Sequence, residues 1–202
     1  MTKEAKKAMR AAVLLARSGL SAPERHSAAL LLSENLLGLA VLRGARRVAA
    51  YWPFGSEPSP VGALEALRER GVSVLLPVGL TDGDLDWAPY TGRDDLGSGA
   101  WRFVEPTAPR LGAAAIAAVD AVFVPALAVD ARGGRLGRGS GSYDRSLARV
   151  PAGVPILAIV YDEELVARVP TEAHDRPVTH VVTPVRVLDV AAFRRRRTAN
   201  DG

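Results

Sequence analysis

The sequence predicts a single α/β domain whose mostly parallel sheet is flanked by helices. Its 202 residues suit one domain, and 48% of them are apolar, which is typical of a globular chain. Short apolar segments alternate with segments of helical spacing, the pattern of strand–helix–strand units. No repeat or long linker divides the chain. We therefore assign residues 1–193 to one domain and predict that residues 194–202, which begin with four arginines, form a basic and disordered tail.

Helices are predicted where apolar residues recur at helical spacing. The first ends at Gly19, a suitable C-terminal cap. The second starts with a capping box made by Ser21 and Glu24. The predicted helical segments are 3–18, 22–37, 61–70 and a helix that begins within 140–150.

Strands are predicted in the short apolar segments between these helices, and residues 96–109 are predicted to form a long loop. In a parallel sheet the ligand lies beyond the carboxyl ends of the strands. The loops after Tyr51, Pro77, Pro125 and Tyr161 are therefore the places where we expect chemistry. The predicted strands are 46–53, 72–78, 85–90, 120–125, 155–161 and 179–184.

The composition argues against nucleic acid and a membrane as partners. A formal charge of +4 favours nucleic-acid binding, but the arginine run lies in the predicted tail, and aromatic residues, 5% of the chain, are not interleaved with it as stacking platforms. The apolar run 111–129 is interrupted by Asp120 and Pro125, so we interpret it as a buried strand and not as a membrane span. We expect a cytoplasmic monomer, since the chain opens on no apolar signal segment and contains no cysteine.

The segment "RLGRGSGSYDR", residues 135–145, has the composition of a phosphate-binding loop. Alternate glycines let backbone N–H groups approach an anion, and a following helix adds its dipole. Arg138 and Arg145 supply positive charge, whereas Asp144 is best explained as a ligand of Mg²⁺ beside the phosphates. A flexible surface loop is the alternative, because the segment is neither a Walker loop nor a dinucleotide fingerprint.

The longer segment "VPALAVDARGGRLGRGSGSYDR", residues 124–145, closely resembles the signature of the 5-formyltetrahydrofolate cyclo-ligases, also called methenyltetrahydrofolate synthetases. Four further segments resemble the family in the right order, so the resemblance extends from Lys3 to about Pro184. These are the Lys6–Arg10 pair, "YWPFGSEPS" with Glu57, "WRFVEP" with Glu105 and Pro106, and the closing segment with His174 and Asp175.

Four positions depart from the family pattern. Ser142 stands where the family usually has a tyrosine, and Val129 replaces a phenylalanine. Glu164 occupies a position often filled by glutamine, and Thr179 one often filled by an acid.

The resemblance implies an enzyme that converts 5-formyltetrahydrofolate to 5,10-methenyltetrahydrofolate with ATP and Mg²⁺, through a phosphorylated formyl group. It implies catalytic roles for Arg138 and Arg145, and Mg²⁺ binding by Asp144 and Asp175. Substrate-binding residues would be Tyr51, Glu57 and Trp101. Nucleotide-binding residues would be Lys6, Arg10, Gly137, Arg138, Gly139, Ser140, Gly141, Ser142, Tyr143, Asp144 and Arg145.

Each role has a plainer alternative. Lys6 and Arg10 share a helix face and suit ordinary surface charge. Asp175 suits a turn cap, Trp101 a core position, and Tyr143 a structural role. The competing functions are a related α/β protein that binds phosphate or nucleotide with another substrate, and a non-catalytic binding protein.

Overall fold

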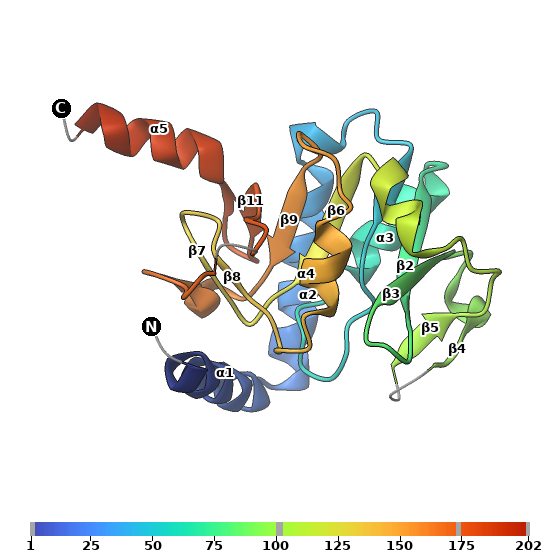
Figure 1. The fold of residues 1–202 in the computed structure, drawn as a ribbon, viewed down its shortest axis with the longest axis horizontal. Coiled ribbons are helices and arrows are strands. Elements are labelled where there is room, and N and C mark those ends of the chain that lie inside the picture. The colour runs from blue at the N-terminus through green and yellow to red at the C-terminus, as the bar shows by residue number, and fades with distance from the viewer. Residues whose placement is uncertain (1–2, 100–102, 173–174, 201–202) are drawn as a thin grey trace.

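The computed structural model describes residues 3–99, 103–172 and 175–200, which form a central seven-stranded sheet between helices (Figure 1). The strand order is β12-β11-β9-β6-β1-β2-β3. The five inner strands are parallel, and β3 and β12 pair antiparallel at the two edges. The α/β class is thereby confirmed. The strands are β1 (Arg47–Ala49), β2 (Ser73–Gly79), β3 (Leu85–Pro89), β6 (Ala121–Pro125), β9 (Ile156–Ile159), β11 (His180–Val182) and β12 (Val187–Asp189).

Two small sheets that the sequence analysis did not predict lie beside the main one. A three-stranded sheet in the order β10-β7-β8 contains the residues just before the glycine segment. A β4–β5 hairpin occupies the segment predicted as a long loop, so that prediction was wrong. The strands are β4 (Leu96–Ser98), β5 (Val104–Pro106), β7 (Ala128–Asp130), β8 (Arg135–Leu136) and β10 (Leu165–Val166).

The predicted helices are present, and short 3-10 helices connect other elements. Helix α2 begins with the predicted capping box, in which Ser21 Oγ accepts from Glu24 N (3.4 Å) and Ser21 N donates to Glu24 Oε2 (2.7 Å). The helices are α1 (Lys3–Ser18), α2 (Ala22–Leu37), α3 (Val61–Glu69), α4 (Ser142–Leu147) and α5 (Val190–Asn200), with 3-10 helices η1 (Ala40–Leu42), η2 (Arg93–Asp95), η4 (Ala113–Ala118) and η5 (Asp162–Glu164).

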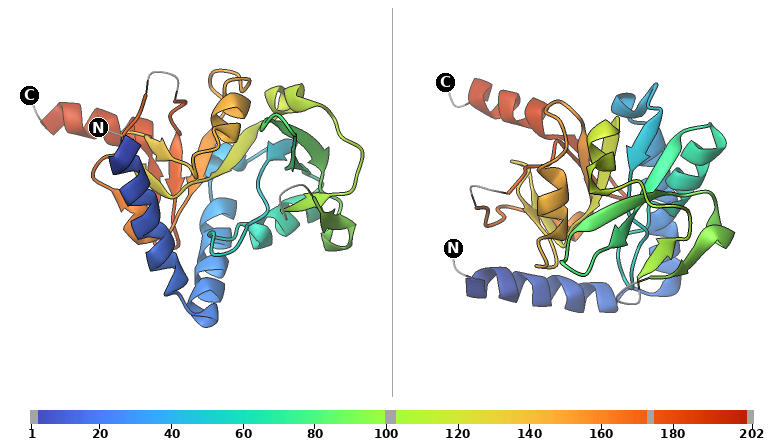
Figure 2. Two further views of the ribbon diagram at one scale, coloured as in Figure 1. Left: turned by 60° about the horizontal axis from the view of Figure 1, so that its bottom comes forward. Right: turned by 45° about the vertical axis from the view of Figure 1, so that its right-hand side comes forward.

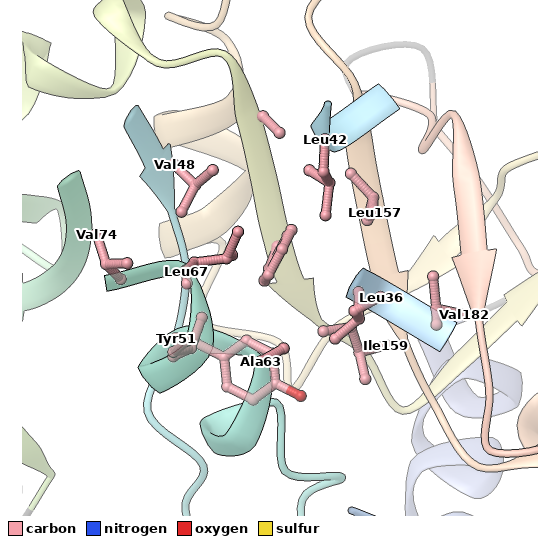
Figure 3. Close-up of a cluster of buried hydrophobic side chains, with 14 of the residues drawn as sticks. Leu36, Leu42, Val48, Tyr51, Ala63, Leu67, Val74, Leu157, Ile159 and Val182 are labelled. Carbon is pink, nitrogen blue, oxygen red and sulfur yellow. The ribbon is translucent and has the colours of Figure 1, made fainter. Parts of the chain in front are cut away.

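Both faces of the inner strands are buried, because helices cover each side. Leu36 of α2 and Leu67 of α3 pack with Val48, Leu157 and their neighbours on one face (Figure 3). The opposite face packs against Ile116 of η4 and Leu147 of α4. The core thus holds the inner strands from both sides. Because these strands are parallel, the loops that follow them lie at the same edge of the sheet.

Helix α1 lies apart from the layered body and forms a V with α2 (Figure 2). Among its described residues only Arg17 is buried. Met9 is partly buried and packs on Ala128, Leu136 and Val169, a small cluster at the three-stranded sheet. Few apolar contacts therefore hold α1 in place.

The C-terminal basic segment is part of α5, which begins at Val190 and continues through the arginine run (Figure 1). Residue 194, where the predicted tail begins, lies within this helix, and the division of the chain at that residue stays a prediction. No helix in the described part of the chain combines the length and apolar character needed to span a bilayer.

Candidate active site

A cavity of about 990 Å³ opens at the carboxyl ends of β1, β2 and β6. Three of the four predicted loops contribute to its wall, through residues that include Tyr51, Pro77 and Pro125. Tyr161, in the fourth, is absent from the described lining, and its ring instead lies 5.7 Å from the Arg17 guanidinium. The glycine segment and α1 close the cavity at one end, and the Tyr51–Glu57 loop and the β4–β5 hairpin border the other.

The glycine segment turns into α4 with the backbone that the sequence predicts. Gly139 and Gly141 have φ values of +108° and +71°, a region that disfavours residues with a Cβ. A Cβ on Gly139 would also lie 3.3 Å from Arg10 Cζ. Ser140 and Ser142 join their hydroxyls at 3.1 Å across the turn. Backbone groups therefore face the cavity with little side-chain cover.

Two cations of α1 reach this end of the cavity. Arg10 Nε donates to Gly137 O at 2.9 Å, which joins α1 to the glycine segment. Lys6 Nζ lies 2.7 Å from Glu172 Oε1 and 3.9 Å from Asp175 Oδ2. Both side chains of the predicted pair line the cavity.

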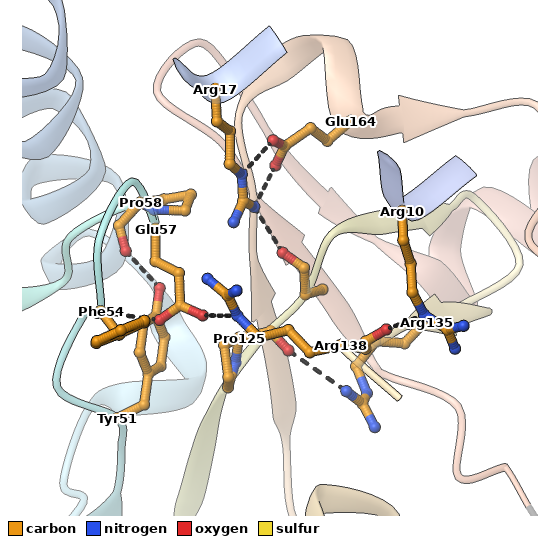
Figure 4. A network of polar contacts seen from close by, with 12 residues as sticks. Arg10, Arg17, Tyr51, Phe54, Glu57, Pro58, Pro125, Arg135, Arg138 and Glu164 are labelled. Atoms are coloured by element: carbon orange, nitrogen blue, oxygen red, sulfur yellow. Dashed lines mark hydrogen bonds and ion pairs between the residues drawn. The ribbon is translucent and has the colours of Figure 1, made fainter. Parts of the chain in front are cut away.

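Arg138 crosses the cavity from the glycine segment to the Tyr51–Glu57 loop (Figure 4). Its Nε donates to Glu57 Oε1 at 2.8 Å, and its guanidinium lies 5.7 Å from the Phe54 ring centroid. Glu57 also accepts from Phe54 N at 3.0 Å. Phe54 in turn meets Phe103 edge-on, with centroids 4.9 Å apart. A predicted phosphate-side cation and a predicted substrate-side carboxylate are therefore in direct contact.

The two predicted metal ligands both line the cavity. Asp144 pairs with Arg135, and Asp175 accepts from Glu172 N at 2.7 Å. Among the described residues no group of three acidic, histidine or cysteine side chains forms a metal cage. Two carboxylates on the same cavity wall as the glycine segment nevertheless fit Mg²⁺, which usually takes one or two carboxylates together with substrate phosphate oxygens.

The remaining predicted residues differ in their placement. Tyr51 is buried and donates from its hydroxyl to Pro58 O at 2.5 Å, and burial raises its pKa well above the usual value. Tyr143 packs against both faces of the core, and burial raises its pKa too. Arg145 is absent from the described cavity wall, and its guanidinium donates to the carbonyl oxygens of Gly83 and Ser140. Trp101 lies outside the described residues.

Comparison with known proteins adds what the geometry leaves open. The model of the 5-formyltetrahydrofolate cyclo-ligase family matches residues 2–184. The chain belongs to this family. It is 40% identical over 191 residues to a 5-formyltetrahydrofolate cyclo-ligase of Mycolicibacterium smegmatis, which covers 92% of this chain and 97% of the relative. A cyclo-ligase of Haemophilus influenzae is 26% identical and covers 90% and 99%.

Solved structures of cyclo-ligase relatives have the same fold. The 5,10-methenyltetrahydrofolate synthetase of Aquifex aeolicus superposes with a TM-score of 0.79 at 29% identity, over 92% of each chain. The synthetase of Mycoplasma pneumoniae gives a TM-score of 0.72 over 89% of this chain and 98% of the other, and at 19% identity it supports the fold alone.

The departures from the cyclo-ligase pattern have local explanations in this structure. Val129 is fully buried in β7, where its smaller side chain packs in the core. Thr179 Oγ1 accepts from Ile156 N at 2.9 Å and donates to Ile156 O at 3.0 Å, so a neutral side chain closes this backbone contact. Glu164 forms an ion pair with Arg17.

Three cavity or loop residues of this cyclo-ligase family member were missed as site residues. Arg135 is almost fully buried, holds Asp144 and donates to Pro125 O at 3.4 Å. Asp130 accepts from the N–H groups of Arg132, Gly134 and Val169, each at 2.9 Å, and so shapes the loop before the glycines. Glu105 is buried and accepts from Gly79 N at 2.9 Å at the end of β2. Arg135 and Glu105 stand in the quoted motifs, but a motif alone does not show which side chain is buried.

Proposed function

We propose that this chain catalyses the cyclisation of 5-formyltetrahydrofolate to 5,10-methenyltetrahydrofolate, with ATP converted to ADP and phosphate. Membership of the cyclo-ligase family over residues 2–184 carries the proposal. The cavity supports it, since it combines a glycine loop and cations at one end with a carboxylate and aromatic rings at the other. One enclosed space thus suits both a phosphate donor and a flat heterocycle.

The nucleotide occupies the end of the cavity formed by α1 and the glycine segment. Backbone N–H groups between Gly137 and Gly141 face the phosphates, with Arg138 adding charge. Lys6 and Arg10 approach from α1, and their present partners, an acidic cluster and a backbone carbonyl, are exchanged for phosphate oxygens. Arg145 steadies the turn through backbone carbonyls and contributes long-range charge.

The reduced folate occupies the opposite end. Glu57 lies there with its side chain only 8% exposed, so its carboxylate meets the folate nitrogens in a poorly hydrated setting. Phe54 and Phe103 offer aromatic surfaces against which a pterin ring packs. Buried Tyr51 fixes the backbone of this loop through Pro58 and so positions Glu57.

The reaction follows from this placement. The formyl oxygen is a poor leaving group, so it first attacks the γ-phosphorus of ATP and becomes a phosphate ester, with ADP leaving. N10 then attacks the activated carbon, phosphate departs with the former formyl oxygen, and the proton of N10 is released to solvent. Arg138 lies between the two ends of the cavity and stabilises charge on the transferring group, while the walls hold the reactants in line and limit access of water.

Asp144 and Asp175 would hold Mg²⁺ at the nucleotide end. The ion supplies charge neutralisation for the ATP phosphates. Within the protein, Arg135 keeps Asp144 directed at the cavity, and the Glu172 N–H restrains Asp175. We further propose that the enzyme acts as a monomer in the cytoplasm. Size-exclusion chromatography with light scattering checks the monomer, and a dimer would contradict it.

The decisive assay uses the full chain with 5-formyltetrahydrofolate, ATP and MgCl₂, and follows the methenyl product by its absorbance. We expect product formation that requires ATP and stops when EDTA removes Mg²⁺. Unchanged 5-formyltetrahydrofolate, in a sample that binds ATP, would refute the proposed reaction and leave the non-catalytic alternative.

A further inference from the structure

The buried ion pair between Arg17 and Glu164 joins α1 to the rest of the molecule (Figure 4). Arg17 Nε donates to Glu164 Oε1 at 2.6 Å and Nη2 donates to Glu164 Oε2 at 2.8 Å, a two-pronged contact. Arg17 Nη2 also donates to Ala126 O at 2.7 Å. The side chains of Arg17 and Glu164 are 1% and 7% exposed. Water therefore competes little for this contact.

The partners of Arg17 stand at the edge of the sheet where the cavity opens. Ala126 follows β6 and lines the cavity. Glu164 belongs to η5, which follows β9, and its Oε2 also accepts from Tyr161 N at 2.9 Å. Arg17 thus ties α1 to the loops after two inner strands, both held by the core. The core therefore holds the two loops that position α1.

The spacing of residues along α1 links the Arg17 contact to Lys6 and Arg10 at the proposed nucleotide end of the cavity. Arg17 stands seven residues after Arg10, which is two helical turns, and Arg10 stands four residues after Lys6. The three side chains therefore share one face of α1. Because α1 has little apolar contact with the body, the polar contact at Arg17 sets the angle at which Lys6 and Arg10 approach the cavity.

A contribution to the stability of the fold is a poor explanation for the buried pair of Arg17 and Glu164. Removing two charges from water is expensive, and apolar residues of similar volume often replace a buried pair without loss. Arg17 Nη1 is moreover buried without a hydrogen-bond partner among the described residues. A buried pair with an unsatisfied donor is better explained by the orientation that it enforces.

We propose that Arg17 and Glu164 are positioning residues that hold α1, and with it Lys6 and Arg10, in register with the nucleotide phosphates. The inference rests on the proposed nucleotide role of that end of the cavity. Neither residue touches the reactants. We expect their effect to fall on the affinity for ATP more than on the affinity for the folate.

The test compares nucleotide and folate affinities by calorimetry, with a non-hydrolysable ATP analogue plus MgCl₂ and with 5-formyltetrahydrofolate. Glu164→Gln removes the charge and keeps the shape, and we expect it to raise the Kd for the analogue about ten-fold, the cost of one charge-assisted contact. Arg17→Lys keeps the charge without the two prongs and should give a smaller rise. The folate Kd should change less than about two-fold in both.

Two further variants separate positioning from stability. The double variant Arg17→Met/Glu164→Leu replaces the pair by apolar groups, and its Tm measures how far packing offsets the lost contacts to Ala126 O and Tyr161 N. We expect it to bind the analogue as weakly as Glu164→Gln. Arg186→Met breaks another arginine pair on the same 3-10 helix, to Asp162 at 3.2 Å, without touching α1, and should leave both affinities unchanged.

Each outcome decides the proposal. Parental nucleotide affinity in Glu164→Gln, or in a double variant of parental Tm, would overturn it, as would a parent that binds no nucleotide. A parent that binds the analogue but forms no methenyl product would refute the proposed reaction, while the affinities would still decide the role of the pair.

Discussion

Replacing Arg138 by alanine removes the one cation seen to join the two ends of the cavity within the described residues. The contact to Glu57 is 2.8 Å long, with Arg138 38% and Glu57 8% exposed. A hydrogen bond to a charged group contributes about 1.5–3 kcal/mol. Since Arg138 is more than a third exposed, we discount its part in stability to about 1 kcal/mol. The Tm should then fall by about 2–4 °C.

Catalysis should suffer more than stability. Loss of a charge-assisted contact to the transferring phosphate should lower kcat/KM for ATP about ten- to a hundred-fold. Glu57 would lose its cation, so KM for 5-formyltetrahydrofolate should rise about two- to five-fold, the equivalent of about 0.5–1 kcal/mol. Arg138→Lys should recover part of the loss, because it restores charge without the planar fork.

The assay is steady-state methenyl formation with ATP varied at saturating folate, then the reverse. Arg68→Ala is the matched control, since Arg68 is 36% exposed, pairs with Glu65 at 3.1 Å and lies away from the cavity wall on α3. Combining Arg138→Ala with Glu57→Gln gives a double-mutant cycle, in which we expect a coupling of about 0.5–1 kcal/mol. Arg138→Ala with the ATP kinetics of Arg68→Ala would show that this reasoning is wrong.

Three shorter predictions address other parts of the molecule. Asp144→Asn should raise the Mg²⁺ concentration that gives half-maximal activity with little change in folate affinity, and an unchanged requirement would exclude Asp144 as a ligand. Removing residues 194–202 should leave kcat and both KM values within about two-fold, since the family match ends at residue 184, and a large loss in a folded truncation would refute this. Burial lowers the pKa of His180, so the folded state disfavours its protonation and stability should decline as pH falls from about 6.5 through that lowered value. His180→Asn should flatten this decline in a Tm series from pH 8 to 5, and an identical slope would contradict it.

The parallel core could be predicted from sequence because its signals are local. A strand buried on both faces is a continuous apolar run, as in "DAVFVP", and a helix end carries its own cap, as at Ser21. The small sheets escaped prediction because β4, β7 and β8 are only two or three residues long, and their pairing depends on partners elsewhere in the chain. The arginine run suggested an irregular tail, since charge predicts exposure and not the helix that α5 extends through it.

Part of the candidate site could likewise be predicted from the sequence, and part could not. Glycines, arginines and a carboxylate within eleven residues predicted a phosphate-binding segment, the family motif predicted Glu57, and the structure places both on one cavity wall. Sequence spacing does not show that Arg138 reaches Glu57, 81 residues away, or that Arg135 turns toward Asp144. The sequence analysis did not single out Arg17, because nothing in the sequence shows that its side chain is buried.

Arg17 and Glu164 are 147 residues apart in the chain, so they are translated at different times. At about 5–20 residues per second, a ribosome needs about 7–30 s to travel from one partner to the other. Helix α1 is translated before Glu164, so this anchor does not exist until most strands of the sheet have been made. Over that interval its polar face has only solvent and passing partners to meet. Helix α1 therefore acquires its final position only after residues as far along the chain as Glu164 have been made.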